Sequence, residues 1–222
     1  MNVDVFGDGT DLVWLMGWGN QADGRHERWF VDRLVEGGYR VHAIELPTNG
    51  ADFEADYLDP VRAYRAEVDD HALVTHSMGG LVAAHLRPDR PVVFLSPWWG
   101  LGEAAPDVAR VIGKLPLAAR VVPTPMDPEA LGKLAEPRDH TAPDRLSPAW
   151  LGTMVAAQKT LPPIDPDDAV FYSPADPVVD TAVIEEHAAE ARLEPYDGGH
   201  ELFASADRAE HVERVLDALD SR

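Results

Sequence analysis

The chain has 222 residues, 45% of them apolar, which is enough for one domain with a sizeable core. Its 39 acidic and 19 basic residues give a formal net charge of −20, so nucleic acid and anionic membrane surfaces are poor partners. The absence of Cys excludes disulfides, thiolate metal sites and a cysteine nucleophile.

The first hundred residues predict an alternation of strands and helices. Residues 12–16 form a continuous apolar run, as in a strand that is buried on both faces of a parallel sheet. A helix at 25–36 has an apolar side and ends at a glycine pair. The other expected elements are an edge strand at 2–6, strands at 39–46, from 73 to Ser77 and at 92–95, and helices at 60–68 and 78–86. This order is typical of an α/β fold with a doubly wound, mostly parallel sheet and right-handed crossovers.

The pattern changes after residue 100. Proline recurs and no strand-like run is present up to about 166, so we expect several short helices, one of them capped by Ser147 with Pro148 in its first turn. The first pattern then resumes with a strand at 169–172, a helix at 181–191, a strand at 192–196 and a helix at 206–219. We therefore divide the chain into a core at 1–100 and 166–222 and a small helical lid insertion at 101–165.

The strand that begins at residue 73 runs directly into a helix, with Ser77 at the turn between them. Such a turn exposes the serine hydroxyl as a nucleophile, and it requires a small residue two positions later, where Gly79 stands. The backbone N–H of Met78 opens the helix and is free to donate to an oxyanion. The segment resembles the nucleophile elbow of the α/β-hydrolase superfamily, Gly-x-Ser-x-Gly, with Thr75 in place of the first Gly. The resemblance implies the α/β-hydrolase fold for nearly the whole chain outside the lid.

A serine nucleophile needs a histidine base and an acid that orients the base, and two later loops supply them. Asp176 lies in the loop after the predicted strand at 169–172, and His200 lies between the last strand and the last helix. In the α/β-hydrolases that the chain resembles, the order is serine, acid, histidine. Asp180 is a second candidate for the acid, but it is placed to open the following helix.

The second oxyanion donor is expected from the loop after the first core strand. The sequence Gly17-Trp18-Gly19 in this loop looks like the His-Gly-Trp-Gly loop of several small esterases, with Met16 in place of the His. The resemblance assigns the donor to the backbone N–H of Trp18, whose ring either lines the acyl pocket or packs in the core. Trp98 and Trp99, after another strand, likewise either line the acyl site for substrate binding or anchor the lid.

The other histidines suggest no chemistry. His76, next to the serine, is expected to point away from it in a structural role. We expect His26, His71, His187 and His211 at ordinary surface positions.

The resemblance implies a serine hydrolase that cleaves carboxylic esters or thioesters through an acyl-enzyme on Ser77. Such an enzyme needs no metal and no cofactor. Its partner is expected to be a small-molecule ester with an apolar acyl group, selected by the lid. The alternative on the same fold is a ligand-binding protein without turnover.

One motif is also consistent with a different class of protein. Gly17, Gly19 and Ala22 after a strand fit a dinucleotide-binding fingerprint, with Glu45 as a ribose ligand. A bulky Trp between the glycines opposes close approach of a pyrophosphate, and the helix begins too late for its N-terminus to meet the phosphates. The dinucleotide-binding interpretation therefore ranks below the hydrolase.

The acidic composition and the scarcity of lysine, with only Lys114, Lys133 and Lys159 in the chain, resemble proteins of salt-loving organisms. Salt relieves self-repulsion because the Debye length falls to about 3 Å at molar ionic strength. No apolar run is long enough to span a bilayer, and the first residues do not form a signal-like region. We expect a cytoplasmic, halophilic protein.

Overall fold

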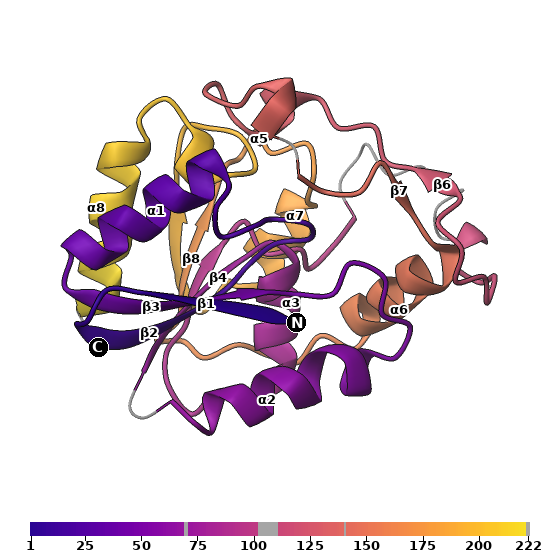
Figure 1. Ribbon diagram of the computed structural model, residues 1–222, viewed down its shortest axis with the longest axis horizontal. Helices are drawn as coiled ribbons and strands as arrows, with labels where there is room; N and C mark the ends of the chain where they lie inside the picture. Colours follow the sequence, from indigo (N-terminus) through magenta and orange to yellow (C-terminus); the bar gives the residue numbers. More distant parts are fainter. Residues whose placement is uncertain (69–70, 102–110, 140, 221–222) are drawn as a thin grey trace.

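A seven-stranded sheet forms the middle layer of the protein, between helices on both of its faces (Figure 1). The computed structural model describes residues 1–68, 71–101, 111–139 and 141–220. The strands lie in the order β1-β3-β2-β4-β5-β8-β9, and among the described residues of this sheet only the pairing of β1 with β3 is antiparallel. They are β1 (Asn2–Phe6), β2 (Thr10–Leu15), β3 (Tyr39–Glu45), β4 (Ala72–His76), β5 (Val93–Leu95), β8 (Ala169–Tyr172) and β9 (Arg192–Pro195). The predicted doubly wound, mostly parallel sheet is confirmed.

The two faces of the sheet are covered by different helices. Side chains alternate along β2, so that Leu12 and Trp14 pack against one layer while Val13 and Leu15 pack against the other. All four are fully buried, as expected for a parallel strand with both faces covered. The first layer contains α1 (Arg25–Glu36) and α8 (Arg208–Asp220), and the second contains α2 (Asp59–Arg65), α3 (Met78–Leu86), α6 (Pro148–Lys159) and α7 (Thr181–His187). Figure 1 shows α1 and α8 above the sheet and α2 and α3 below it.

The helices at 25–36 and 78–86 have the predicted bounds, whereas the helix expected from residue 60 begins earlier. A π-helical turn, η1 (Glu54–Leu58), runs directly into α2. The side chain of Asp52 starts this turn, because its Oδ1 accepts the backbone N–H of Ala55 at 3.0 Å.

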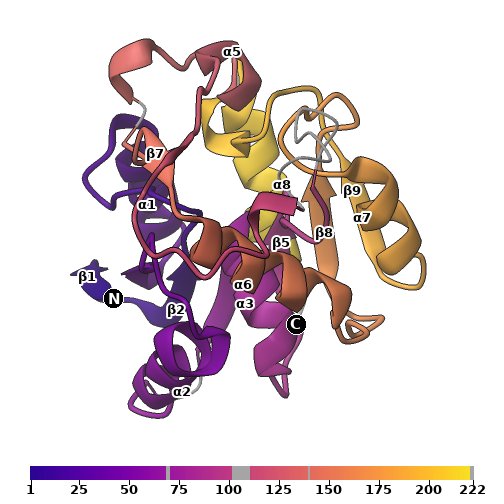
Figure 2. The ribbon, with the colours of Figure 1, turned by 90° about the vertical axis from the view of Figure 1, so that its right-hand side faces the viewer.

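The described part of the segment between β5 and β8 consists of loops, short helices and the longer α6, and in Figure 2 it lies on the side of the molecule that faces the viewer. It contains α5 (Pro128–Leu131), η2 (Pro137–Asp139) and α6, which is capped as predicted, since Ser147 Oγ accepts the backbone N–H of Trp150 at 3.1 Å. The expectation of no strand here is wrong, because β6 (Val122–Pro123) pairs antiparallel with β7 (Arg145–Leu146). Each strand has two residues, too few for a local pattern to mark them. Residues 102–110 and 140 of the predicted lid lie outside the described residues.

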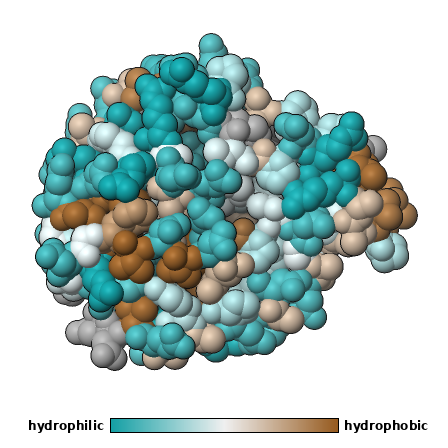
Figure 3. Space-filling view, in the orientation of Figure 1, coloured by the Kyte–Doolittle hydropathy of each residue, from teal (hydrophilic) through white to brown (hydrophobic). Residues whose placement is uncertain are grey.

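The surface is largely hydrophilic, with apolar side chains near β1 and at the end of the molecule that carries β6 (Figure 3). Among the described residues, the large apolar ones that are exposed are Met1, Val5, Val111, Leu115, Leu117 and Val121. Over the described residues, no helix combines the length and the apolar composition that a membrane span requires.

Candidate active site

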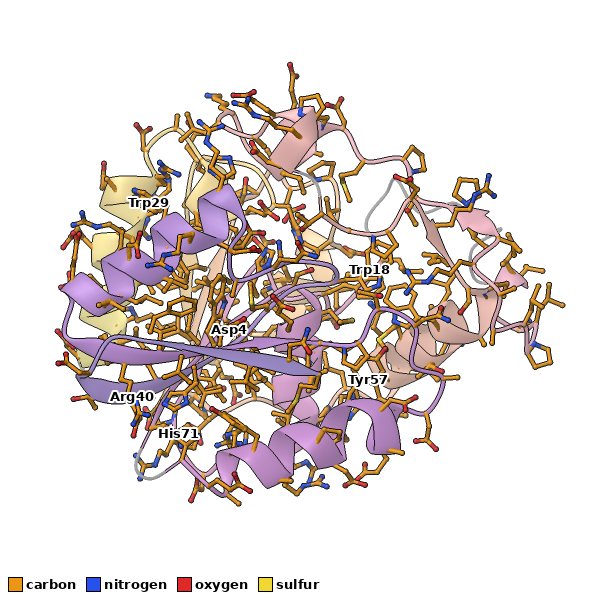
Figure 4. The ribbon with its side chains drawn as sticks, in the orientation of Figure 1. Asp4, Trp18, Trp29, Arg40, Tyr57 and His71 are labelled. Atoms are coloured by element: carbon orange, nitrogen blue, oxygen red, sulfur yellow. The ribbon has the colours of Figure 1, made fainter. Side chains whose placement is uncertain are left out.

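Loops that follow β2, β4, β8 and β9 come together at the carboxyl ends of the parallel strands. Figure 4 distinguishes the two ends of the sheet: Arg40 and His71 lie at the amino ends of β3 and β4, and Trp18 lies beyond the carboxyl end of β2. Open parallel sheets keep their ligands at the carboxyl ends of their strands. The three residues of the predicted triad follow β4, β8 and β9 and are brought together there.

Ser77 occupies a sharp turn between β4 and α3. Its backbone has φ 50° and ψ −115°, a conformation that few residues other than Gly adopt. The Ser77 N–H donates to the carbonyl of Leu95 at 3.0 Å, and its own carbonyl accepts the N–H of Trp98 at 3.0 Å, so neighbouring segments hold the turn. A Cβ on Gly79 would lie 2.1 Å from the carbonyl oxygen of Leu15. The predicted need for a small residue two positions after the serine is therefore met by close passage of α3 over β2.

His200 lies between Ser77 and Asp176. Its Nδ1 is 2.8 Å from Asp176 Oδ2, and its Nε2 is 2.9 Å from Ser77 Oγ. With Nδ1–H donating to the carboxylate, Nε2 is free to accept the serine proton. All three residues are buried, with exposed fractions of 7% for Ser77, 4% for His200 and 7% for Asp176.

The carboxylate of Asp176 controls the protonation of His200. Burial lowers the pKa of the imidazole, but the charge and the hydrogen bond of Asp176, and then the charge of Glu201, outweigh burial and raise that pKa above its ordinary value. The other Asp176 oxygen, Oδ1, accepts the backbone N–H of Val178 at 2.8 Å, which fixes the direction of the carboxylate. The alternative acid, Asp180, instead accepts the N–H of Val183 at the start of α7.

The two predicted oxyanion donors belong to the first turn of α3 and to the loop after β2. Met78 is the first residue of α3, where a backbone N–H has no intrahelical acceptor. The ring of Trp18 fixes this residue in place. Its Nε1–H donates to the carbonyl of Thr48 at 3.1 Å, and its centroid lies 5.0 Å from that of the Trp150 ring.

The two adjacent tryptophans after β5 have different surroundings. Trp98 is half-buried and stacks on Trp150 at 5.7 Å between ring centroids, so Trp18, Trp150 and Trp98 form one aromatic group. Trp99 is 1% exposed, donates from Nε1 to the carbonyl of Gly80 at 3.3 Å and packs against Phe94 in the core. Only Trp98 of this pair belongs to the aromatic group.

The loop that contains His200 also rests on α5. The backbone N–H of His200 donates to the carbonyl of Ala130 at 2.9 Å, and that of Glu201 donates to the carbonyl of Leu131 at 2.8 Å. Contact is close, because a Cβ on Gly199 would lie 2.5 Å from the same Leu131 oxygen. A segment from between β5 and β8 therefore supports the histidine backbone.

The model of the alpha/beta hydrolase family matches residues 13–217, nearly the whole chain. The protein belongs to the alpha/beta hydrolase family.

Relatives and solved structures agree with this assignment. Over 98 residues, this alpha/beta hydrolase is 32% identical to a pimeloyl-[acyl-carrier protein] methyl ester esterase of Aeromonas salmonicida, a match that spans 41% of this chain and 37% of that esterase. The monoacylglycerol lipase of Paleococcus ferrophilus has a TM-score of 0.80 at 19% identity, with 99% of this chain and 98% of that chain covered. A soluble variant of monoglyceride lipase from Saccharomyces cerevisiae has a TM-score of 0.77 at 15% identity, with 97% and 89% covered. These two structures share its fold.

A buried polar cluster of this hydrolase was not predicted. Asn20, two residues after Trp18, contacts Glu27 on α1, Glu201 beside His200, and His76 on β4. The sequence contained a signal, since an acid directly follows His200, but in a chain with 39 acids this position did not stand out. His76, for which we predicted a structural role pointing away from Ser77, has its ring centroid 4.9 Å from that of His200.

The surface assignment of the other four histidines is wrong. His26, His71 and His211 are buried, and His187 is half-buried. His26 lies between Asp139 and Arg208, while His187 and His211 contact backbone carbonyls of distant loops. Their partners are mostly far along the chain, so no local pattern marks these histidines as buried.

Two residues of the dinucleotide fingerprint, Ala22 and Glu45, are hydrogen-bonded to each other. Glu45 Oε1 accepts the backbone N–H of Ala22 at 2.9 Å, and helix α1 begins only at Arg25, well beyond Gly17 and Gly19. Within the part of the chain that the structure describes, no group of three or more His, Asp or Glu side chains is arranged to hold a metal ion.

Proposed function

We propose that this alpha/beta hydrolase is a serine hydrolase that cleaves carboxylic esters or thioesters. The observation that supports the proposal most directly is the hydrogen-bonded series Ser77–His200–Asp176, with distances of 2.9 and 2.8 Å, at the carboxyl end of the sheet. The partial match to a methyl ester esterase agrees with ester chemistry, as do the lipase names of the structures that share the fold.

In the proposed reaction, Ser77 Oγ attacks the carbonyl carbon of the ester while His200 Nε2 takes the hydroxyl proton. Asp176 stabilises the imidazolium that forms. The tetrahedral intermediate collapses, the leaving alcohol takes the proton from His200, and an acyl ester remains on Ser77. His200 then removes a proton from water, which attacks the acyl carbonyl carbon; the acid leaves as the bond to Ser77 Oγ breaks, and Oγ takes back the proton from His200.

The backbone N–H groups of Met78 and Trp18 are the proposed oxyanion donors. A donor of this kind acts on charge that develops only in the transition state, and its loss typically lowers kcat by about 10²–10³. The backbone at Ser77 is strained, with φ 50°. Strain of roughly 1–3 kcal/mol persists only where surrounding contacts impose it, and it is typical of active sites, so it supports a catalytic role for this turn.

The substrate is proposed to be a small ester with an apolar acyl group, selected by a lid formed from residues 101–165. The aromatic group of Trp18, Trp98 and Trp150 adjoins both the proposed oxyanion loop and the turn at Ser77, and it offers an apolar wall for the acyl group. Ser77 is 7% exposed, and movement of the proposed lid is our explanation for how the substrate reaches it.

The proposal is tested by covalent labelling with a fluorophosphonate probe in high salt, on the wild type, Ser77→Ala and His200→Ala. We expect labelling of the wild type only, with circular dichroism showing that both variants are folded. Hydrolysis of p-nitrophenyl esters of increasing acyl length then defines the acyl preference. A folded wild type that neither labels nor hydrolyses any ester would favour the ligand-binding alternative, and labelling that survives Ser77→Ala would move the nucleophile elsewhere.

A further inference from the structure

Asn20 joins three parts of the proposed catalytic site. It lies in the loop after β2 that contains Trp18, and its side-chain nitrogen Nδ2 lies 2.6 Å from Glu27 Oε1 and 2.9 Å from Glu201 Oε1. Its side-chain oxygen Oδ1 lies 3.0 Å from Nδ1 of His76 at the end of β4. The oxyanion loop, the strand before the nucleophile and the residue after His200 therefore meet at one amide.

The partners of the amide fix its orientation. Both hydrogens of the Asn20 amide are used when Nδ2 donates to the two carboxyl groups, and Oδ1 then accepts Nδ1–H of His76. Burial, and then the neighbouring His200, hold the pKa of His76 well below its ordinary value, so its ring is neutral. In this tautomer His76 Nε2 has no proton, so it does not donate to the backbone carbonyl of His200, which lies 3.4 Å away; the ring and the histidine loop are in contact only.

The two carboxyl groups are buried close together with little compensating charge. Glu27 is 3% exposed and Glu201 is 7% exposed, and among the described residues neither forms an ion pair with Lys or Arg. Burial, and then the charge of Glu201, raises the pKa of Glu27 to about 8, and burial also raises the pKa of Glu201. Because both carboxyl groups contact the one amide nitrogen of Asn20 and each is buried, ionisation of one opposes ionisation of the other.

Other titratable groups face this pair from several elements. Asp139 on η2 adds negative charge and raises the pKa of both acids, while His200 favours ionisation of Glu201. His76 on β4 is neutral, and Tyr196, which follows β9, stays protonated because burial raises its pKa. None of these groups removes the repulsion between Glu27 and Glu201.

We propose that Glu27 and Glu201 share one proton behind His200, and that Asn20 fixes this pair to the oxyanion loop so that the pair positions and electrostatically supports the His200 imidazolium. The inference rests on the proposed function of the same site. Glu27, Asn20 and Glu201 are positioning residues, since they act through His200 and the loop that contains Trp18. The remaining single negative charge adds to that of Asp176 when His200 takes the serine proton.

The proton sharing is tested without turnover, by NMR titration of the protein labelled with ¹³C at the glutamate carboxyl carbons. Glu27→Gln and Glu201→Gln assign the signals, and Glu186→Gln, which removes an exposed acid on α7, is the matched control. We expect the pair to titrate in two separated steps, the upper one in the neutral to alkaline range. The upper step should disappear in both pair variants and remain in the control. If both carboxyl groups of the wild type lose their protons near pH 4–5, the proposal is overturned.

The effect on His200 is tested by the pH profile of kcat/KM for a p-nitrophenyl ester. Glu201→Gln should lower the pKa of His200, so the acid limb should move toward lower pH by about one unit and kcat should fall roughly tenfold. Glu27→Gln should instead abolish the inflection from the upper titration of the pair, because Glu201 then ionises alone. If the pH profiles of the wild type and both variants are identical, the pair of Glu27 and Glu201 does not support the His200 imidazolium. If the NMR titration shows the two separated steps but the wild type hydrolyses no ester, the proton sharing by Glu27 and Glu201 stands and the proposed function is rejected.

Discussion

The carboxylate of Asp176 lies against the ring of His200, with Oδ2 2.8 Å from Nδ1. Asp180, four residues later, caps α7 by accepting the backbone N–H of Val183 at 3.3 Å. Asn can accept the same backbone N–H at a helix N-terminus, but at position 176 it would disturb the orientation and charge that His200 requires. We expect Asp176→Asn to lower kcat by about 10³–10⁴ and Asp180→Asn to leave kcat within about twofold. Ester hydrolysis by the two purified variants measures this, and the reverse order would assign the acid to Asp180.

Replacement of Gly79 should disrupt the turn at Ser77. A Cβ at this position would lie 2.1 Å from the backbone oxygen of Leu15, and a backbone oxygen cannot move away cheaply. Gly38 is the comparison, because it has φ 92° and no atom within 4 Å of an added Cβ. We expect Gly79→Ala to lower the free energy of unfolding by several kcal/mol and Gly38→Ala by only about 1 kcal/mol. Urea unfolding gives both values, and equal losses would show that the crowding at Gly79 is relieved at no cost.

The stability of the protein should fall as pH rises toward the alkaline range. Burial raises the pKa of Glu27 to about 8, so the folded protein keeps a proton that the unfolded chain loses near pH 4.5. The unfolded state therefore binds fewer protons between these values, and the free energy of unfolding decreases across this window by on the order of a few kcal/mol. Glu27→Gln should be more stable than the wild type at pH 9 and nearly equal to it at pH 5. Urea unfolding at both values, with Glu186→Gln as the control, measures the difference, which should be absent in the control.

Salt should stabilise the protein. The formal net charge of −20 produces self-repulsion, which is screened over about 10 Å at 0.1 M salt and about 3 Å at 1 M. We expect the melting temperature and the rate of ester hydrolysis to rise together between 0.1 and about 2 M KCl. Thermal unfolding at several KCl concentrations tests the expectation. A melting temperature that is highest without added salt would contradict the halophilic interpretation.

Trp98 should influence acyl-chain preference. Its half-buried ring stacks on Trp150 in the aromatic group beside the turn at Ser77. We expect Trp98→Ala to change the ratio of kcat/KM for long and short p-nitrophenyl esters by about tenfold, because truncation opens space for the acyl group. Trp29 on α1 is the control, since its ring lies under Arg208 in the layer on the opposite face of the sheet. If Trp98→Ala and Trp29→Ala have the same ratio as the wild type, Trp98 does not contact the acyl group.

Local sequence was sufficient to predict the structure where one short segment determines the geometry. The bounds of α3 follow from the turn at Ser77, and the start of α6 follows from the cap at Ser147. The polar cluster could not be predicted in this way, because Asn20 and Glu201 are separated by 181 positions and meet only through the order of the strands. His26 is buried for the same reason, since its partners Asp139 and Arg208 lie on distant elements.

The backbone bonds between α5 and the histidine loop link access to the site with alignment of the base. The carbonyls of Ala130 and Leu131 hold the N–H groups of His200 and Glu201, so displacement of α5 leaves both donors without these acceptors. In the proposed mechanism, any movement that displaced α5 would therefore remove backbone support from His200, whereas a movement that left α5 in place would preserve it. The described part of the chain between β5 and β8 is thus bound to the protein at two places: α5 holds the histidine loop, and α6 packs in the core through Trp150 and Met154.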